Sequence, residues 1–221
     1  ISYLKVGKLI SKQNYDKIVI ENNMFVYDIV QSKNKNNTAL IYHMHNDFNE
    51  WDKTIDNYKI IAKTAQKILV VSNYIKNRIN SVEKTNKVRL LYNSVDTNIY
   101  NMKKVVNLRE KYNISTDDIV IGYSGRITEE KGILELVKAI RNLKTNRNIK
   151  LLIVGSQWYG KLEKDMYLEK IEREIKDIKD KIIFTGYIKQ EDMPSIYNMM
   201  DILVVPSIWA EPFGCVTIEG M

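Results

Sequence analysis

Short apolar runs alternate with amphipathic helical patterns along the chain, and this alternation restricts the fold more than any other feature. The strands that it predicts cover residues 17–20, 39–42, 68–72, 88–92, 119–124, 149–154, 182–185 and 202–205. Helical patterns lie between them, near residues 51–66, 74–80, 132–143 and 161–181. Strands separated by helices are typical of βαβ units, whose strands pair in parallel. The sequence therefore predicts an α/β fold with two doubly wound parallel sheets.

A polar stretch from Asn93 to Tyr100 divides the two sets of strands. Its Asn and Asp residues favour turns, because their short side chains hydrogen-bond to nearby backbone. We interpret it as part of an interdomain connection. The predicted organisation is a first domain over 1–95, a linker over 96–110 and a second domain over 111–221.

Two helical patterns in the second half differ in their charge. In residues 132–143, Ile133, Val137 and Ile140 share one face, which we expect to be buried. Residues 161–181 carry seven positive and seven negative charges, while apolar residues keep helical spacing through the segment. This pattern predicts an amphipathic surface helix rather than a charged binding tail.

The net charge of +7 is concentrated in the first half of the chain. Residues 1–100 carry 15 Lys and Arg against 9 Asp and Glu, a net of +6, whereas residues 101–221 carry 19 against 18, a net of +1. Lys59, Lys63 and Lys67 recur at helical spacing. They form either a solvated face or a surface that attracts an anionic membrane or acceptor. A nucleic-acid partner is not expected, because the basic residues lack interleaved aromatics and known nucleic-acid motifs.

The segment Gly125–Gly132 places two cations, Arg126 and Lys131, between glycines directly after a predicted strand. Loops at the carboxyl ends of parallel strands bind ligands, and helix N-termini there favour anions. Arg offers a planar fork for phosphate oxygens, and Lys a compact point charge. The segment predicts a phosphate site, and the plainer alternative is a surface Arg and Lys beside a helix start.

The segment Glu211–Glu219 follows the last predicted strand and holds two carboxylates around Gly214. If Gly214 opens a helix, Phe213, Gly214 and Cys215 present backbone N–H groups to ligand oxygens. Carboxylates suit sugar hydroxyls, so the two segments together predict a nucleotide-sugar site. The alternative is a helix that merely carries acidic residues near its N-terminus.

His43 and His45 are the only histidines, and both lie at the end of a predicted strand. Residues two apart on a strand face the same way, as metal ligands must. No third ligand with suitable spacing follows them, and Asp47 alone is weak support, so no metal is expected. The chain also lacks an Asp-x-Asp motif, which argues against a metal-bridged diphosphate. Cys215 has no histidine near it in sequence, so we assign it a packing or backbone role rather than that of a nucleophile.

Taken together, these segments resemble the retaining glycosyltransferases of the GT-B fold, in the glycosyl transferases group 1 family that includes sucrose-phosphate synthases and bacterial mannosyltransferases. The resemblance is dense over residues 93–221 and loose before them. The motifs that carry it are Asn93–Asp96, Gly125–Gly132, Ile153–Gly155, Phe184–Tyr187, Met193–Tyr197, Asp201–Ser207 and Glu211–Glu219. It implies two Rossmann-like domains that face a cleft, with the acceptor on the first and the donor on the second.

The resemblance also implies a role for each matching residue. Arg126 and Lys131 would bind the donor diphosphate, while His45 and Glu211 would contact the donor sugar at the reaction centre. Tyr187 and Ile188 would contact the base, and Glu219 would bind the ribose. The backbone of Phe213, Gly214 and Cys215 would face sugar and phosphate, and Gly125 would also belong to the donor site. It implies no metal or other cofactor, with a nucleotide sugar and a glycan or glycolipid acceptor as partners.

The expected reaction moves a sugar from a UDP- or GDP-sugar to an acceptor hydroxyl in bacterial polysaccharide or glycolipid synthesis. The expected location is the cytoplasm, with peripheral contact at the inner face of the plasma membrane. Ser94 stands where the family usually has glycine, and the family's early glycine-rich loop and closing helices are missing. We therefore expect a fragment that transfers no sugar by itself. The alternatives are a GT-B sugar-nucleotide epimerase and an inactive nucleotide-sugar-binding module.

Overall fold

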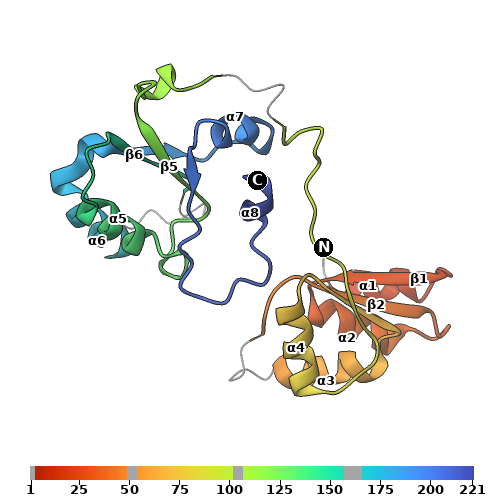
Figure 1. The fold of residues 1–221 in the computed structure, drawn as a ribbon. Coiled ribbons are helices and arrows are strands. Elements are labelled where there is room, and N and C mark those ends of the chain that lie inside the picture. The colour runs from red at the N-terminus through yellow and green to blue at the C-terminus, as the bar shows by residue number, and fades with distance from the viewer. Residues whose placement is uncertain (1–2, 49–53, 102–106, 157–165) are drawn as a thin grey trace. The chain divides into compact units, whose positions relative to one another are not determined.

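The computed structural model describes residues 3–48, 54–101, 107–156 and 166–221, and the chain forms two compact units (Figure 1). The first unit is Ile1–Asn93 and the second is Ser94–Met221. Each unit is described by itself below. Within the described residues, no helix combines the length and the apolar character needed to cross a bilayer.

The first unit is built on a sheet of four parallel strands in the order β1-β2-β3-β4. Its strands are β1 (Lys17–Glu21), β2 (Ala39–Met44), β3 (Lys67–Val70) and β4 (Val88–Leu90). Its helices are α1 (Tyr3–Ile10), α2 (Met24–Lys33), α3 (Thr54–Thr64) and α4 (Asn73–Val82). Asn23 and Ser72 cap the starts of α2 and α4, because each side chain accepts a hydrogen bond from a backbone N–H three residues later.

The second unit also has a sheet of four parallel strands, but in the order β7-β6-β5-β8. Its strands are β5 (Ile119–Ser124), β6 (Ile149–Val154), β7 (Ile182–Gly186) and β8 (Ile202–Leu203). Its α-helices are α5 (Ile133–Asn142), α6 (Met166–Glu174), α7 (Met193–Tyr197) and α8 (Cys215–Glu219). Short 3-10 helices connect them, namely η2 (Glu110–Tyr112), η3 (Glu129–Lys131), η4 (Lys176–Lys181) and η5 (Gln190–Asp192).

Strand β6 divides its side chains between two cores. Leu151 and Ile153 are fully buried in a core shared with α5 and α6. Leu152 and Val154 point to the other face, into a core shared with α7. Successive side chains of a strand face opposite ways, so a continuous apolar run fits a sheet covered on both faces (Figure 1). The parallel sheets of the two units confirm the predicted α/β fold, and in the second unit helices cover both faces of the sheet.

All eight predicted strands are present, with small shifts at their ends. The last is the shortest, because β8 pairs with β5 only at Ile202 and Leu203. Pro206 follows soon after and has no N–H to donate. The buried positions expected on the helix after Gly132 are also confirmed, since Ile133, Val137 and Ile140 all lie in the core.

Three details of the helices differ from the prediction. Helices α1, α2 and α7 were not predicted. The pattern over 161–181 forms α6 and then η4, with non-helical backbone at Ile178, and residues 161–165 of it lie outside the described residues. Lys67 does not continue the helical face of Lys59 and Lys63, so that part of the prediction is wrong. Helix α3 ends at Thr64 because the N–H of Gln66 donates to the carbonyl of Leu40, which starts strand pairing.

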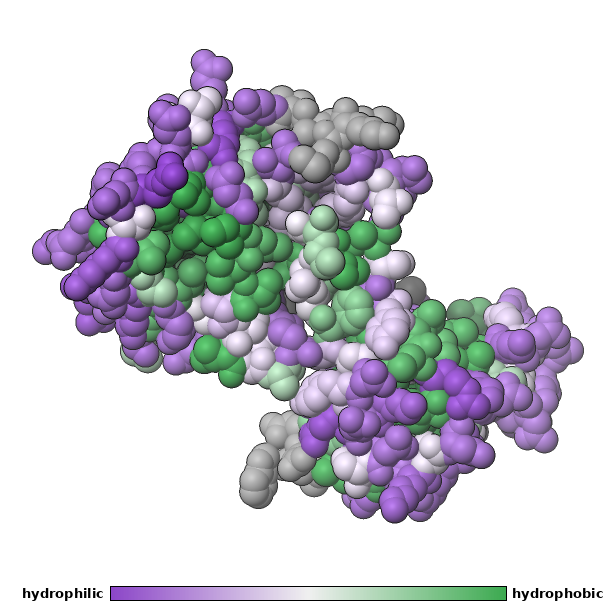
Figure 2. Space-filling view, viewed as in Figure 1, coloured by the Kyte–Doolittle hydropathy of each residue, from purple (hydrophilic) through white to green (hydrophobic). Residues whose placement is uncertain are grey.

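Apolar side chains remain exposed around the sheet of the second unit. Phe184 on β7 and Ile202 on β8 are exposed, as is Val205 just beyond β8. Figure 2 shows a broad hydrophobic area on the visible face of this unit, bordered by hydrophilic side chains. Exposed apolar areas of this kind favour association in solution.

Gly132 brings two loops of the second unit into close contact. Its backbone is left-handed (φ +69°), and a Cβ built on it would lie 2.0 Å from the carbonyl oxygen of Pro206. The backbone N–H of Ile208 also donates to the carbonyl of Glu130 at 3.0 Å. The loop after β5 and the loop after β8 therefore pack backbone against backbone, which only a glycine permits at this point.

We expect Gly132→Ala to lower the free energy of unfolding by about 1–3 kcal/mol more than Gly186→Ala does. Gly186 is a matched control, because it has nearly the same left-handed φ (+71°) but no atom within 4 Å of the position that a Cβ would take. The measurement is urea unfolding followed by circular dichroism. Equal losses in the two variants would contradict close loop packing at Gly132.

Candidate functional site

The donor-side residues predicted from sequence lie on loops that follow β5 and β8. These strands are hydrogen-bonded neighbours and run in parallel, so their carboxyl ends meet at the same edge of the sheet. Arg126 and Lys131 stand on the loop after β5, and Glu211 on the loop after β8. The fold thereby places cations and a carboxylate on adjacent loops.

Lys131 and Glu211, 80 residues apart in sequence, form an ion pair at the centre of this region. The Nζ of Lys131 donates to Oε1 of Glu211 at 2.5 Å, and the hydroxyl of Ser207 donates to the same oxygen at 2.7 Å. The two paired side chains expose only 18% and 21% of their surface. The ammonium also lies 5.2 Å from the ring centre of Trp209, within cation–π range. The predicted diphosphate cation and the predicted sugar carboxylate are thus in direct contact.

The surroundings of Glu211 keep its carboxylate ionised. Burial alone would raise the pKa of this group, but the hydrogen bonds from Lys131 and Ser207 outweigh that effect and lower the pKa below its ordinary value. An ionised carboxylate accepts hydrogen bonds and donates none. Glu211 is therefore suited to ligand hydroxyls at neutral pH.

Arg126 stands at the rim of the same region. Its guanidinium is about half exposed and lies 3.6 Å from the carboxylate of Glu130. The loop beneath it is held by the hydroxyl of Tyr123, which donates to the carbonyl of Arg126 at 2.6 Å. The N–H of Gly125 donates to the carbonyl of Val154 at 3.0 Å, which fixes the loop at the end of β6. A cation on an anchored loop with access to solvent can receive a phosphate.

The other predicted contacts lie further along the segment that follows β8 and after β7. Phe213, Gly214 and Cys215 lead into α8, where Gly214 is left-handed and Cys215 is exposed. The carboxylate of Glu219 accepts a hydrogen bond from the hydroxyl of Tyr197 at 2.7 Å. Tyr187, which is exposed, and Ile188, which packs partly on the α7 core, follow β7. Strand β6 lies between β7 and β5, so one strand separates the segment of Tyr187 and Ile188 from the loop of Arg126 and Lys131.

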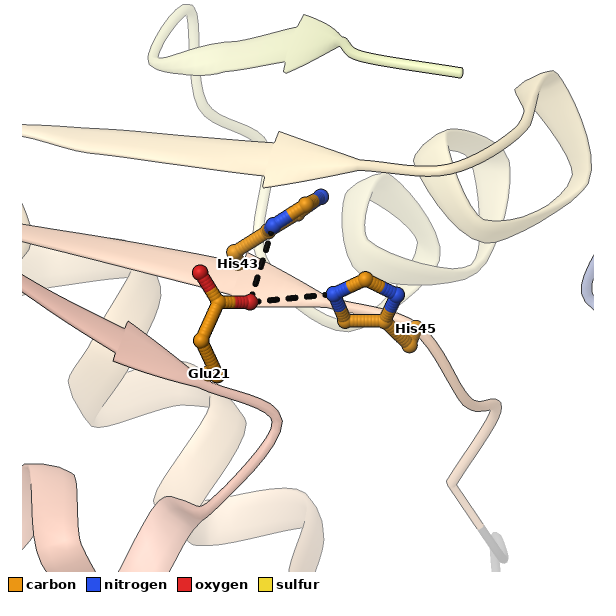
Figure 3. A group of neighbouring side chains, drawn as sticks. All are labelled: Glu21, His43 and His45. Carbon is orange, nitrogen blue, oxygen red and sulfur yellow. Dashed lines mark hydrogen bonds and ion pairs between the residues drawn. The ribbon is translucent and has the colours of Figure 1, made fainter. Parts of the chain in front are cut away.

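In the first unit, the histidines meet a carboxylate that the sequence analysis did not select. Glu21 ends β1 and is the register partner of His43 on β2. Its Oε2 lies 2.9 Å from Nδ1 of His43 and 3.0 Å from Nε2 of His45 (Figure 3). The two imidazole rings are 4.1 Å apart at their centres. Glu21, His43 and His45 form one group, which we call the histidine cluster.

Backbone contacts fix His45 in the histidine cluster. The side-chain oxygen of Asn22 accepts hydrogen bonds from the N–H of His45 at 3.0 Å and from that of Asn46 at 3.2 Å. Asp47, which the sequence offered as a further ligand, instead binds Arg78 at 2.9 Å and Tyr74. Burial and the neighbouring His45 lower the pKa of His43, and this effect outweighs the attraction of Glu21.

Comparison with known proteins places this arrangement in a family. A family model described as "Glycosyl transferases group 1" matches residues 104–221. The chain belongs to this family. It is 33% identical over 220 residues to the lipopolysaccharide 1,2-N-acetylglucosaminetransferase of Salmonella typhimurium, covering 99% of the chain and 55% of that relative. It is 30% identical to the capsular polysaccharide biosynthesis glycosyltransferase CapM of Staphylococcus aureus, covering 73% and 42%.

Solved structures support the fold of this family member. The structure of Anabaena HepE in complex with UDP matches with a TM-score of 0.84 at 19% identity, covering 99% of this chain and 60% of that one. Sucrose-phosphate synthase from Thermosynechococcus elongatus matches with a TM-score of 0.77 at 22% identity, covering 99% and 58%. The GT-B fold predicted from the sequence motifs is confirmed. The chain spans about half the length of the relatives it matches.

Three residues that shape the candidate sites were not selected from the sequence. Tyr123 and Ser207 hold Arg126 and Glu211 through hydrogen bonds. Glu21 joins the two histidines. Of the three, only Glu21 could have been predicted from the sequence, because it directly follows a predicted strand that neighbours the strand of His43. Aligning the ends of these two strands would have predicted that Glu21 lies beside the histidines.

The Lys131–Glu211 pair should stabilise the second unit in a pH-dependent way. Because the folded-state pKa of Glu211 is lowered from about 4.5, the stabilisation is complete above that value and is lost as pH falls through the folded-state pKa. A double-mutant cycle with Glu211→Gln and Lys131→Met should give a coupling of about 1–3 kcal/mol at neutral pH. Urea unfolding at several pH values measures it.

The control cycle uses Arg141 and Glu174, an ion pair at 2.7 Å whose arginine is 45% exposed. Exposed pairs of this kind couple by about 1 kcal/mol or less. A Lys131–Glu211 coupling no larger than this, or one that stays unchanged well below pH 4.5, would contradict our description of the buried pair.

Proposed function

We propose that this chain is part of a retaining glycosyltransferase that moves a sugar from a UDP- or GDP-sugar to an acceptor hydroxyl. The observation that carries the proposal is the contact between Lys131 and Glu211 on neighbouring loops at the carboxyl ends of β5 and β8. Family membership supports the same reaction class. A phosphate-binding cation beside a hydroxyl-binding carboxylate is what a nucleotide-sugar donor requires.

The cations act on the leaving group in this proposal. When the bond from sugar to diphosphate breaks, negative charge grows on the phosphate oxygens, and fixed cations stabilise that charge without reorganising. Arg126 supplies a fork that matches two phosphate oxygens. Lys131 has three N–H donors, so it can hold Glu211 and still donate to a phosphate.

The carboxylate and the imidazole act on the sugar. Glu211 accepts hydrogen bonds from the hydroxyls of the donor sugar, with Lys131 and Ser207 fixing its orientation. His45 contacts the donor sugar near the reaction centre, as the family resemblance implies. The departing phosphate helps to deprotonate the acceptor hydroxyl, so no further protein base is required. Glu219 binds the ribose, while Tyr187 and Ile188 contact the base.

The substrate class follows from the relatives rather than from this chain's geometry. The Salmonella relative is named for lipopolysaccharide and the Staphylococcus relative for capsular polysaccharide. HepE was solved with UDP and with UDP-glucose. We propose a bacterial polysaccharide or glycolipid acceptor and action in the cytoplasm. The basic excess of residues 1–100 supports contact with an anionic acceptor or membrane surface.

Nucleoside diphosphates should bind the second unit through Arg126 and Lys131. We expect Arg126→Ala to weaken UDP or GDP by about 2–3 kcal/mol, which is tens- to hundreds-fold in affinity, because charge-assisted hydrogen bonds are lost. Calorimetric titration of UDP and GDP measures the effect. The matched control is Arg141→Ala, a half-exposed arginine in the last turn of α5. Unchanged affinity in the Arg126→Ala, Lys131→Ala double variant would refute the assignment.

Transfer by the complete protein that carries this chain should not depend on a divalent metal. The sequence has no Asp-x-Asp, and Arg126 and Lys131 supply the positive charge that a bridging metal would otherwise provide. We expect activity to persist in EDTA, measured as release of nucleoside diphosphate. Complete loss in chelator, with recovery on adding Mg²⁺ or Mn²⁺, would show that the charge is neutralised by metal instead.

A further inference from the structure

We propose that the histidine cluster is a binding site for a transition-metal ion of the Zn²⁺ type. Among the described residues, Glu21, His43 and His45 are the group of His, Cys, Asp and Glu whose ligand atoms lie within 4.8 Å of one another. An ion in the cluster would occupy Nε2 of His45, so that nitrogen can contact the donor sugar, as proposed above, only in the metal-free state. It departs from the sequence-based expectation that the histidines lack a third ligand.

The backbone alone puts the three residues together. Glu21 and His43 are register partners on adjacent parallel strands, so their side chains leave the same face of the sheet side by side. His45 lies one residue beyond β2, and the centre of its ring is 4.1 Å from that of His43, so it reaches the same carboxylate. The hydrogen bonds from Asn22 hold the backbone just beyond β2 and keep His45 in place.

The side chains converge on a single point. One nitrogen of each imidazole faces the same carboxylate oxygen, at 2.9 Å and 3.0 Å, as Figure 3 shows. Zinc bonds to nitrogen and oxygen are about 2.0–2.2 Å long, so ligand atoms of a tetrahedral site lie about 3.3 Å apart. The two spacings to the carboxylate oxygen are only slightly shorter than this, and all three ligand atoms lie within 4.8 Å of one another. Glu21 is 62% exposed and can retreat by the small distance that an ion between the three atoms requires.

The chemical type of the three ligands indicates which metals suit the histidine cluster. Two imidazoles and one carboxylate suit zinc and neighbouring transition metals, whereas Mg²⁺ and Ca²⁺ prefer oxygen ligands alone. His43 is largely buried, and His45 and Glu21 are progressively more exposed. Solvent can therefore supply a fourth ligand from the open side. Without an ion, the same atoms share hydrogen bonds, so the cluster is stable in both states.

The histidine cluster and the proposed diphosphate site draw on different residues. The histidine cluster belongs to the first unit, whereas Arg126 and Lys131 belong to the second. Metal binding by the histidine cluster would therefore not change how Arg126 and Lys131 neutralise the diphosphate. Removing an ion from the histidine cluster with EDTA would leave that neutralisation intact.

The test is direct metal binding by the 221-residue chain. Calorimetry with Zn²⁺ should show one site in the micromolar range, and Co²⁺ should give the visible absorption of a low-coordinate complex. The chain has only two histidines and one cysteine, so the signals can be assigned. We expect His45→Ala and His43→Ala each to weaken Zn²⁺ by about tenfold or more, with a similar loss in Glu21→Gln.

Cys215→Ser is the control for the exposed thiol and should bind Zn²⁺ as the parent does. His43 lies within β2 and is largely buried, so its variant requires a check by circular dichroism, whereas His45 lies beyond the strand and its variant should fold. Loss in a folded His45→Ala variant supports the site. Zinc binding that is absent from the parent, that persists in His45→Ala, or that vanishes in Cys215→Ser overturns the proposal.

Discussion

Parallel pairing of neighbouring strands is the constraint on which both candidate sites depend. It makes the carboxyl ends of β5 and β8 meet at one sheet edge, which brings Lys131 to Glu211 across 80 residues of sequence. It also aligns Glu21 with His43 at the ends of β1 and β2. In each unit, the candidate functional side chains lie where the strands end, because loops there are not needed for pairing and their backbone and side chains remain available to ligands.

A carboxylate lies at the centre of each candidate site, and the two carboxylates differ in their partners and in their exposure. Glu211 is mostly buried and is held by an ammonium and a hydroxyl, so it stays ionised and fixed in orientation. Glu21 is mostly exposed and bridges two imidazoles. A paired carboxylate with little exposed surface is suited to hold sugar hydroxyls, whereas a more exposed one beside two imidazoles is suited to an ion. In our proposals, the same functional group thereby serves two kinds of ligand.

The sequence predicted the fold well because its signals are local. Continuous apolar runs such as Ile149–Val154 can be buried on both faces, and they mark parallel strands without knowledge of their neighbours. Helices α1, α2 and α7 were not predicted, although α2 has an Asn cap at Asn23. The end of helix α6 and the non-helical backbone at Ile178 were not predicted either, because the charge pattern and the apolar spacing continue through both.

The sequence by itself determined the fold class, the family motifs and the residue types available for phosphate, sugar and metal. Glycines near Arg126 and Lys131, and carboxylates around Gly214, are readable because each motif is short and contiguous. Only the tertiary structure decided which of these groups touch. The pairing of Lys131 with Glu211 and the joining of Glu21 to the two histidines both depend on strand order and register. Those depend on which strands pair, and that choice is made by contacts between residues far apart in the sequence.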